Sequence, residues 1–143
     1  MSPVRLLLDT HVIVWAATDA SRLGAKVAGL LTDSGNECWM SAVSAWEIAM
    51  LAERGRVDLR PDVDRWLARA IAGLALREAP LTTAIALESR RFSVPTEDPA
   101  DRFIAATARM HDLVLVTADA ALRRVPGVRV VRCGAARASR TRP

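Results

Sequence analysis

The chain has 143 residues, of which 51% are hydrophobic and 25% are charged. This length and balance are typical of one soluble globular domain that buries a substantial core. No apolar run approaches the roughly 18 residues that a membrane helix needs. The early run at residues 6–8 is interrupted by Asp9, so we expect no signal peptide and a cytoplasmic location.

The net charge of +4 is concentrated at the end of the chain. Residues 133–143 contain three arginines and no acid, which leaves a nearly neutral body. We therefore predict a globular domain at residues 1–132 followed by a basic, disordered tail at 133–143. Cys38 and Cys133 are too few for a disulfide framework and are expected to be free thiols. No cluster of Cys and His has the spacing of a zinc site.

In the first half of the chain, short apolar segments alternate with segments of helical spacing. In chain order we predict a strand at 4–8, a helix capped by Asp9 and Thr10, a helix at 21–31, a strand at 37–40, and a helix from Ser41 to Gly55.

The second half repeats this alternation. We predict a helix after Pro61, a weaker strand at 76–79, a helix at 82–92, a loop at 95–98, a helix at 98–110, the clearest strand at 113–116, a helical turn at 119–123, and a last strand at 128–131. Alternating strands and helices imply an α/β protein, a three-layer α/β/α domain with a central, mostly parallel sheet.

Glu47 is the most unusual residue of the predicted helices. It lies about two turns inside its helix among apolar neighbours, with no opposite charge before Arg54. A buried carboxylate destabilises the fold unless a cation or hydrogen-bond donors meet it. Glu47 could still reach the surface or pair with a distant arginine, so it does not define a site alone.

Three other carboxylates adjoin apolar elements, and each has a structural explanation. Asp9 ends the first strand and Asp119 follows the clearest one, and both can serve as helix N-caps. Asp98 can cap the helix that begins with Pro99, which places Asp101 in the first turn. Acids are favoured there by the exposed amides and the helix dipole.

One metal site at the carboxyl edge of the sheet would explain the four acids together. Like charges need a counter-ion to share a cleft, and oxygen ligands without His or Cys favour Mg²⁺ or Mn²⁺ over zinc. Such an ion can polarise a phosphorus–oxygen bond, lower the pKa of a water and orient its attack. Three hydroxyls near the acids suit supporting hydrogen bonds: Thr10, Ser44 and Thr117.

The order and spacing of these motifs resemble PIN-domain proteins of the VapC toxin type. The matching segments span residues 4 to about 131 and are LLLDTH at 6–11, SAVSAWEIA at 41–49, RGRVDL at 54–59, DPADRFIAA at 98–106 and LVTAD at 115–119. Two positions depart from the pattern. Glu97 stands where some relatives have a basic residue or His, and Met50-Leu51 stand where a Lys is common.

The resemblance implies a metal-dependent endoribonuclease that hydrolyses RNA, is neutralised by a cognate VapB-like antitoxin, and is commonly a homodimer. It assigns the catalytic and metal-binding roles to Asp9, Glu47, Asp101 and Asp119. Five arginines are candidate phosphate contacts: Arg54, Arg56, Arg90, Arg91 and Arg102. The alternative is a catalytically silent PIN-fold module that binds RNA or protein, but such a module need not retain four mutually repelling acids.

Other interpretations of the same residues have less support. The four tryptophans are expected to pack in the core or in a dimer interface rather than to stack on bases: Trp15, Trp39, Trp46 and Trp66. A phosphoaspartate phosphatase would need an acid where His11 stands. A receiver domain would need a lysine late in the chain, whereas Lys26 is the only lysine.

Overall fold

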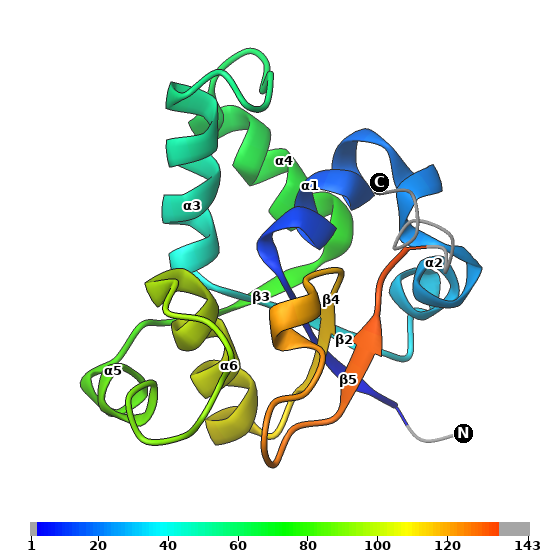
Figure 1. Ribbon diagram of the computed structural model, residues 1–143. Coiled ribbons are helices and arrows are strands. Elements are labelled where there is room, and N and C mark those ends of the chain that lie inside the picture. Colours follow the sequence, from blue (N-terminus) through cyan, green and yellow to red (C-terminus); the bar gives the residue numbers. More distant parts are fainter. Residues whose placement is uncertain (1–2, 135–143) are drawn as a thin grey trace, which may run out of the picture.

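The central layer of the protein is a five-stranded sheet with the order β3-β2-β1-β4-β5. The structure, a computed structural model, describes residues 3–134. The strands are β1 (Arg5–Leu8), β2 (Glu37–Ser41), β3 (Leu76–Ala79), β4 (Val114–Thr117) and β5 (Val130–Arg132). All four strand pairings are parallel, which confirms the predicted sheet (Figure 1).

Helices cover both faces of this sheet, as predicted for three layers (Figure 1). Along β1, Leu6 and Leu8 belong to one buried cluster and Leu7 to the other, because successive side chains of a strand point to opposite faces. The helical elements are α1 (Thr10–Thr18), η1 (Ala20–Leu23), α2 (Ala25–Thr32), α3 (Ala42–Glu53), α4 (Val63–Leu74), α5 (Thr83–Glu88), α6 (Pro99–His111) and η2 (Ala120–Leu122).

The strand order reverses beside β1, because β2 and β3 lie on one side of it and β4 and β5 on the other. The two central strands pair directly, with Leu7 opposite Leu115. Open parallel sheets bind ligands outside the carboxyl ends of their strands at such a reversal. Asp9 directly follows β1 and Asp119 lies two residues after β4, so the fold brings both acids to this position.

Two predicted helices differ from those observed. The helix expected at 21–31 is divided into η1 and α2 by Gly24, whose φ of 82° lies in the left-handed region that favours glycine. The helix expected at 82–92 ends at Glu88. Beyond this point the carbonyls of Ser89 and Phe92 accept hydrogen bonds from Arg102 rather than from a further turn of helix.

The end of the predicted domain continues past residue 132. Cys133 is buried, and its N–H donates to the carbonyl of Thr117 at 2.8 Å. The remainder of the predicted basic tail, residues 135–143, lies outside the described residues. Cys38 and Cys133 are both free, as predicted. Within residues 3–134 no helix has the length and apolar character needed to cross a membrane.

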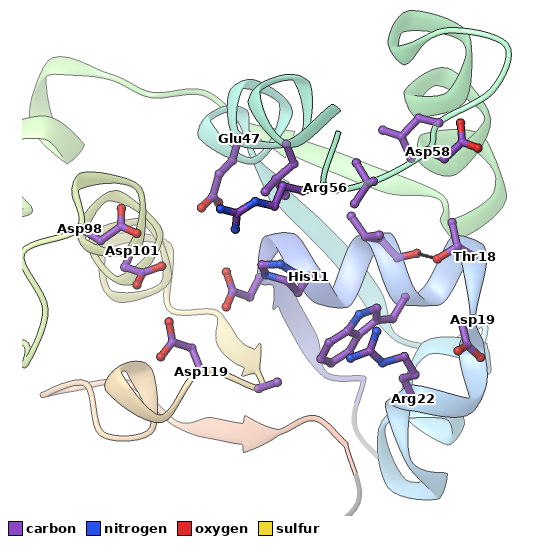
Figure 2. Close-up of a pocket in the computed structure, with 17 residues that line it drawn as sticks. His11, Thr18, Asp19, Arg22, Glu47, Arg56, Asp58, Asp98, Asp101 and Asp119 are labelled. Atoms are coloured by element: carbon purple, nitrogen blue, oxygen red, sulfur yellow. Dashed lines mark hydrogen bonds between the residues drawn. The ribbon is translucent and has the colours of Figure 1, made fainter. Parts of the chain in front are cut away.

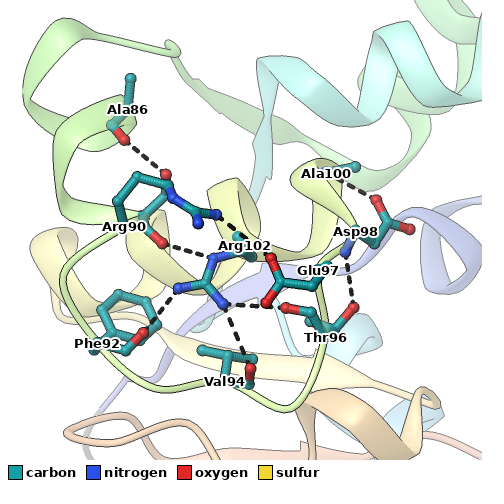
Figure 3. Close-up of polar contacts among 10 residues, drawn as sticks. Ala86, Arg90, Phe92, Val94, Thr96, Glu97, Asp98, Ala100 and Arg102 are labelled. Atoms are coloured by element: carbon teal, nitrogen blue, oxygen red, sulfur yellow. Dashed lines mark hydrogen bonds and ion pairs between the residues drawn. The ribbon is translucent and has the colours of Figure 1, made fainter.

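Arg102 organises the loop between α5 and α6 (Figure 3). Its Nε donates to the carbonyl of Ser89 at 2.9 Å, and its Nη2 donates to that of Phe92 at 2.8 Å. Its Nη1 donates to the carbonyls of Thr96 at 3.1 Å and Val94 at 3.4 Å. The side chain is buried, and the guanidinium is already bound to four carbonyls, so its donors are occupied by the loop rather than directed to a phosphate.

Arg102→Met should lower the free energy of unfolding by about 3 kcal/mol or more, because several buried carbonyls lose a charged donor together. Arg91 is an exposed arginine of the same loop, and Arg91→Met should change that free energy by less than about 0.5 kcal/mol. Urea denaturation of both variants measures the difference. Equal stability of the two variants would show that the loop does not depend on Arg102.

Candidate active site

A cleft of about 770 Å³ opens at the carboxyl edge of the sheet (Figure 2). All four predicted acids line it: Asp9, Glu47, Asp101 and Asp119. They come from four segments that are distant in sequence, namely the ends of β1 and β4 and the helices α3 and α6. The convergence that the strand order predicts is therefore present in the fold.

Asp9 is held in place through both carboxylate oxygens. Its Oδ1 accepts the N–H of Thr10 at 2.8 Å, as expected of the N-cap of α1, and its Oδ2 accepts the hydroxyl of Thr117 at 2.6 Å. Its own N–H donates to the carbonyl of Val116 at 2.9 Å. Burial raises the pKa of Asp9, and the hydrogen bonds from Thr117 and Thr10 oppose that rise.

Glu47 faces the cleft from α3, which explains an acid on an otherwise apolar helix (Figure 2). The hydroxyl of Thr10 donates to Oε1 of Glu47 and also lies within hydrogen-bond distance, 3.0 Å, of the buried Ser44 hydroxyl. Burial raises the pKa of Glu47, and the charges of Asp9 and Asp98 add to the rise, while the Thr10 hydrogen bond opposes it. Thr10 thus connects the acid of α3 to the first turn of α1.

Asp101 occupies the first turn of α6, as predicted, and Asp98 is the N-cap that accepts the N–H of Ala100 at 3.0 Å. Asp101 is only 8% exposed. Burial raises the pKa of Asp101 to about 8, and the charges of Asp9, Asp119 and Asp98 contribute to that rise. At neutral pH this carboxyl therefore tends to hold a proton when no cation is near.

Asp119 is exposed and caps η2, where its Oδ1 accepts the N–H of Ala121 at 2.8 Å. Its own N–H donates to the hydroxyl of Thr117 at 3.0 Å. The same hydroxyl donates to Asp9. Thr117 therefore fixes the side chain of Asp9 and the backbone of Asp119. Of the three predicted supporting hydroxyls, Thr10 and Thr117 contact acids directly, and Ser44 acts through Thr10.

The four acids share the cleft without forming an ion pair to any described residue. Within residues 3–134, none of them forms an ion pair with Lys, Arg or His. In the same part of the chain, no three His, Cys, Asp or Glu side chains are arranged closely enough to hold a metal ion as they stand. An ion bound here would require the carboxylates to rotate towards a common centre.

Of the five arginines predicted to contact phosphate, one lines the cleft. Arg56 lines the cleft, whereas Arg54 and Arg91 are exposed without lining it. Arg90 is exposed and lies 3.9 Å from Glu97 in an ion pair. Arg102 is enclosed by the loop that it holds.

Three residues that were not predicted to belong to the site also line the cleft: His11, Trp15 and Arg22. For His11 and Trp15, the spacing in the sequence could have predicted a shared position at the site. His11 and Trp15 are one turn apart on the helix that Asp9 caps, so they lie on one face of that helix. Arg22 carried no such signal.

The tryptophans divide between core and surface. Trp66 is buried, as predicted, and Trp15 and Trp39 are partly buried. Trp46 is 58% exposed, so it is not a core residue. It lines a second, apolar hollow of about 480 Å³ with Leu81 and Phe103.

Comparison with known proteins places this geometry in a family. The PIN domain model matches residues 6–128. Over 121 residues the chain is 38% identical to Ribonuclease VapC22 of Mycobacterium tuberculosis (strain ATCC 25618 / H37Rv), covering 82% of this chain and 89% of that protein. The chain belongs to the PIN domain family. The predicted resemblance is thus confirmed.

Solved structures agree with this PIN domain in fold. VapBC2 from Rickettsia felis, solved bound to a promoter DNA fragment, aligns with a TM-score of 0.64 and 14% identity over 91% of this chain and 99% of that one. VapBC-1 from nontypeable Haemophilus influenzae aligns with a TM-score of 0.64 and 15% identity, covering 90% of this chain and 98% of that one. At such low identity the agreement concerns the three-layer fold alone.

The raised pKa of Asp101 predicts how the stability of the metal-free PIN domain depends on pH. A carboxyl with a folded-state pKa of about 8 and an ordinary pKa near 3.8 when unfolded holds its proton more tightly in the folded state. Its contribution is complete below the unfolded pKa of 3.8 and is lost progressively as the pH rises to about 8. In EDTA, the free energy of unfolding should fall by about 1 kcal/mol or more between pH 5.5 and 8.5.

Asp101→Asn should flatten this dependence, because the amide cannot ionise. Glu53→Gln, which changes an exposed acid at the end of α3, should keep the wild-type slope. Urea titrations of the three proteins at each pH compare the slopes. A slope that Asp101→Asn leaves unchanged would mean that Asp101 ionises normally in the folded protein.

Proposed function

We propose that this PIN domain is an endoribonuclease that depends on Mg²⁺ or Mn²⁺ and is the toxin of a toxin–antitoxin pair. The observation that carries the proposal is the gathering of four carboxylates, with no ion-pair partner among residues 3–134, at the ligand-binding edge of a parallel sheet. The 38% identity to a protein named as a ribonuclease supports RNA as the substrate.

The donor set fits a hard divalent cation. Every candidate ligand is a carboxylate oxygen, which Mg²⁺ and Mn²⁺ prefer over the nitrogen and sulfur ligands typical of zinc. Asp9, Glu47 and Asp101 would hold the ion, and Asp119 would complete the site directly or through water. When bound, such an ion offsets charge on a phosphodiester and lowers the pKa of the attacking water.

The surrounding residues prepare the carboxylates for this role. The hydroxyls of Thr117 and Thr10 each donate to one oxygen, of Asp9 and of Glu47 respectively, and so keep these two side chains at the cleft. The second oxygen of Glu47 accepts no hydrogen bond from residues 3–134, which leaves it available to a ligand. Asp101 would release its proton as a cation approaches, so cation binding should strengthen as the pH rises.

The cleft also fits the antitoxin partner that the resemblance implies. A guanidinium can bridge two carboxylates, so we expect the partner to insert an arginine among the four acids and to compete with the divalent ion. Away from the acids the cleft has apolar walls from α1, α3 and the segment that follows α3: Val14, Leu51, Val57 and Leu59. These walls suit the apolar face of a partner helix. The homodimer implied by the resemblance stays a prediction.

The alternative, a silent module that only binds RNA or protein, explains the same cleft less well. A binding surface for RNA would be favoured by basic residues, whereas this edge of the sheet holds four acids, three of which have a raised pKa. Such an arrangement lowers stability unless a cation is bound. A function that uses the cation accounts for the acids, and a silent module does not.

Substitutions of Asp101 and Asp98 distinguish a catalytic role from a structural one. Asp101→Asn should abolish cleavage of total RNA in Mn²⁺, whereas Asp98→Asn keeps a good helix cap and should retain most activity. The partner-free protein is incubated with RNA, with EDTA and Asp9→Asn as controls. Full activity of Asp101→Asn would remove that residue from the proposed site, and wild-type cleavage in EDTA would reject metal dependence.

Divalent cations should also raise the melting temperature of the partner-free protein, because they relieve repulsion among the acids. Calorimetry in Mg²⁺ or Mn²⁺, at matched ionic strength in NaCl, measures the effect without any substrate. The double variant Asp9→Asn/Asp101→Asn should show no such rise. An equal rise in wild type and double variant would place the cation elsewhere.

A further inference from the structure

One wall of the cleft carries a row of planar side chains that the proposed metal chemistry does not use. His11 and Trp15 lie one turn apart on α1, with ring centroids 6.0 Å apart. The guanidinium carbon of Arg22 lies over the Trp15 ring, 4.3 Å from its centroid. All three residues line the same cleft as the four acids (Figure 2).

The Trp15–Arg22 pair is held on a firm support. Trp15 packs against the buried cluster on its face of the sheet. Arg22 belongs to η1, where its N–H donates to the carbonyl of Asp19 at 3.1 Å. The next residue, Leu23, is buried, and its carbonyl accepts the N–H of Gly134 at 2.8 Å. The backbone that carries Arg22 is therefore fixed to the end of β5.

Two arginines of the cleft retain unused charge. Within the described residues, neither Arg22 nor Arg56 forms an ion pair. Of the acids at this end of the cleft, Asp58 already pairs with Arg60 at 3.1 Å, and Asp19 accepts the hydroxyl of Ser21 at 2.6 Å. The guanidinium of Arg22 is therefore available to a ligand on its side of the cleft, and that of Arg56, which Figure 2 shows beside Glu47, is available nearer the acids.

The distance along α1 from Asp9 to Trp15 suits a strand of nucleic acid. Asp9 caps α1 and Trp15 follows six residues later, which is about 9 Å along a helix axis. A nucleotide strand rises about 3.4 Å per stacked step, so this distance corresponds to two or three steps. A base on Trp15–Arg22 would thus belong to a nucleotide close to the phosphodiester held at the acids.

We propose that an unpaired base of the RNA substrate stacks on the guanidinium of Arg22, which the Trp15 ring backs, while Arg56 contacts a neighbouring phosphate. Aromatic and guanidinium planes accept any base, because every base has a π face. The site would therefore select single-stranded RNA and would require a base at one position near the cleavage point. This inference rests on the proposed function, since it assumes that RNA enters the cleft.

An abasic scan tests the proposal. The cleavage position in a short single-stranded RNA is first mapped with wild-type protein in Mn²⁺. Binding of the same RNA is then measured by fluorescence anisotropy on an Asp101→Asn background, with a single abasic ribose placed at each position in turn. Loss of the base at one position within about three nucleotides of the cleavage point should weaken binding about tenfold.

Arg22→Lys is the decisive variant, because it keeps the positive charge and removes the planar guanidinium on which a base would stack. It should weaken binding of the intact RNA about tenfold and abolish the further effect of the abasic ribose. Arg22 is exposed, so the substitution leaves the core unchanged. Arg69→Lys, an exposed arginine of α4 that does not line the cleft, is the matched control and should keep the abasic effect.

Each outcome bears on one hypothesis. A flat abasic scan, or an abasic effect that survives in Arg22→Lys, would overturn the stacking proposal while leaving the nuclease proposal intact. Unchanged RNA binding by Arg22→Lys, together with lost binding to the antitoxin partner, would overturn it in favour of a protein-docking role. The expected abasic effect in a protein that never cleaves RNA would support stacking and reject the nuclease function.

Discussion

The main physical constraint on this fold is that like charges are held together at one edge of the sheet. Asp9 and Asp101 are both buried beside further acids, and burial raises the pKa of each. Repulsion and lost hydration both oppose this arrangement, so the rest of the fold must outweigh them. The central strands β1 and β4 supply that support through buried apolar residues. In addition, the hydroxyl of Thr117 hydrogen-bonds both the side chain of Asp9, after β1, and the backbone N–H of Asp119, after β4. Stability elsewhere in the domain thus maintains the cluster of acids at this edge.

The sequence predicted the sheet and the acids well because both depend on local patterns. Short apolar runs mark buried parallel strands, and an acid after such a run must lie at the carboxyl edge whatever the loops do. Glu47 was recognisable because a carboxylate among apolar residues is unusual in a helix. The positions of Asp98 at the N-cap and of Asp101 in the first turn of α6 were predictable as well, since the proline that follows Asp98 fixes where the helix begins.

The sequence did not predict the contacts of residues whose partners are distant in the chain or lie in loops. Arg102 follows a catalytic candidate and looks like a phosphate contact, yet its guanidinium serves four carbonyls of a loop that no periodicity describes. Arg22 could not be connected with Trp15, because the break at Gly24 and the tie between Leu23 and Gly134 set its position. Long-range contacts of this kind are decided by the folded chain as a whole.

The pairing of β1 with β4 has a consequence for how the protein is made. β1 is synthesised long before β4, the central strand that it pairs with, which begins only at Val114. Asp9 gains its contact with Thr117 after most of the chain has been synthesised, and Asp119 comes later still. A nascent chain that ends before Asp119 lacks the complete set of acids. The cleft can therefore assemble, and a partner can recognise it, only after translation has passed β4 and Asp119.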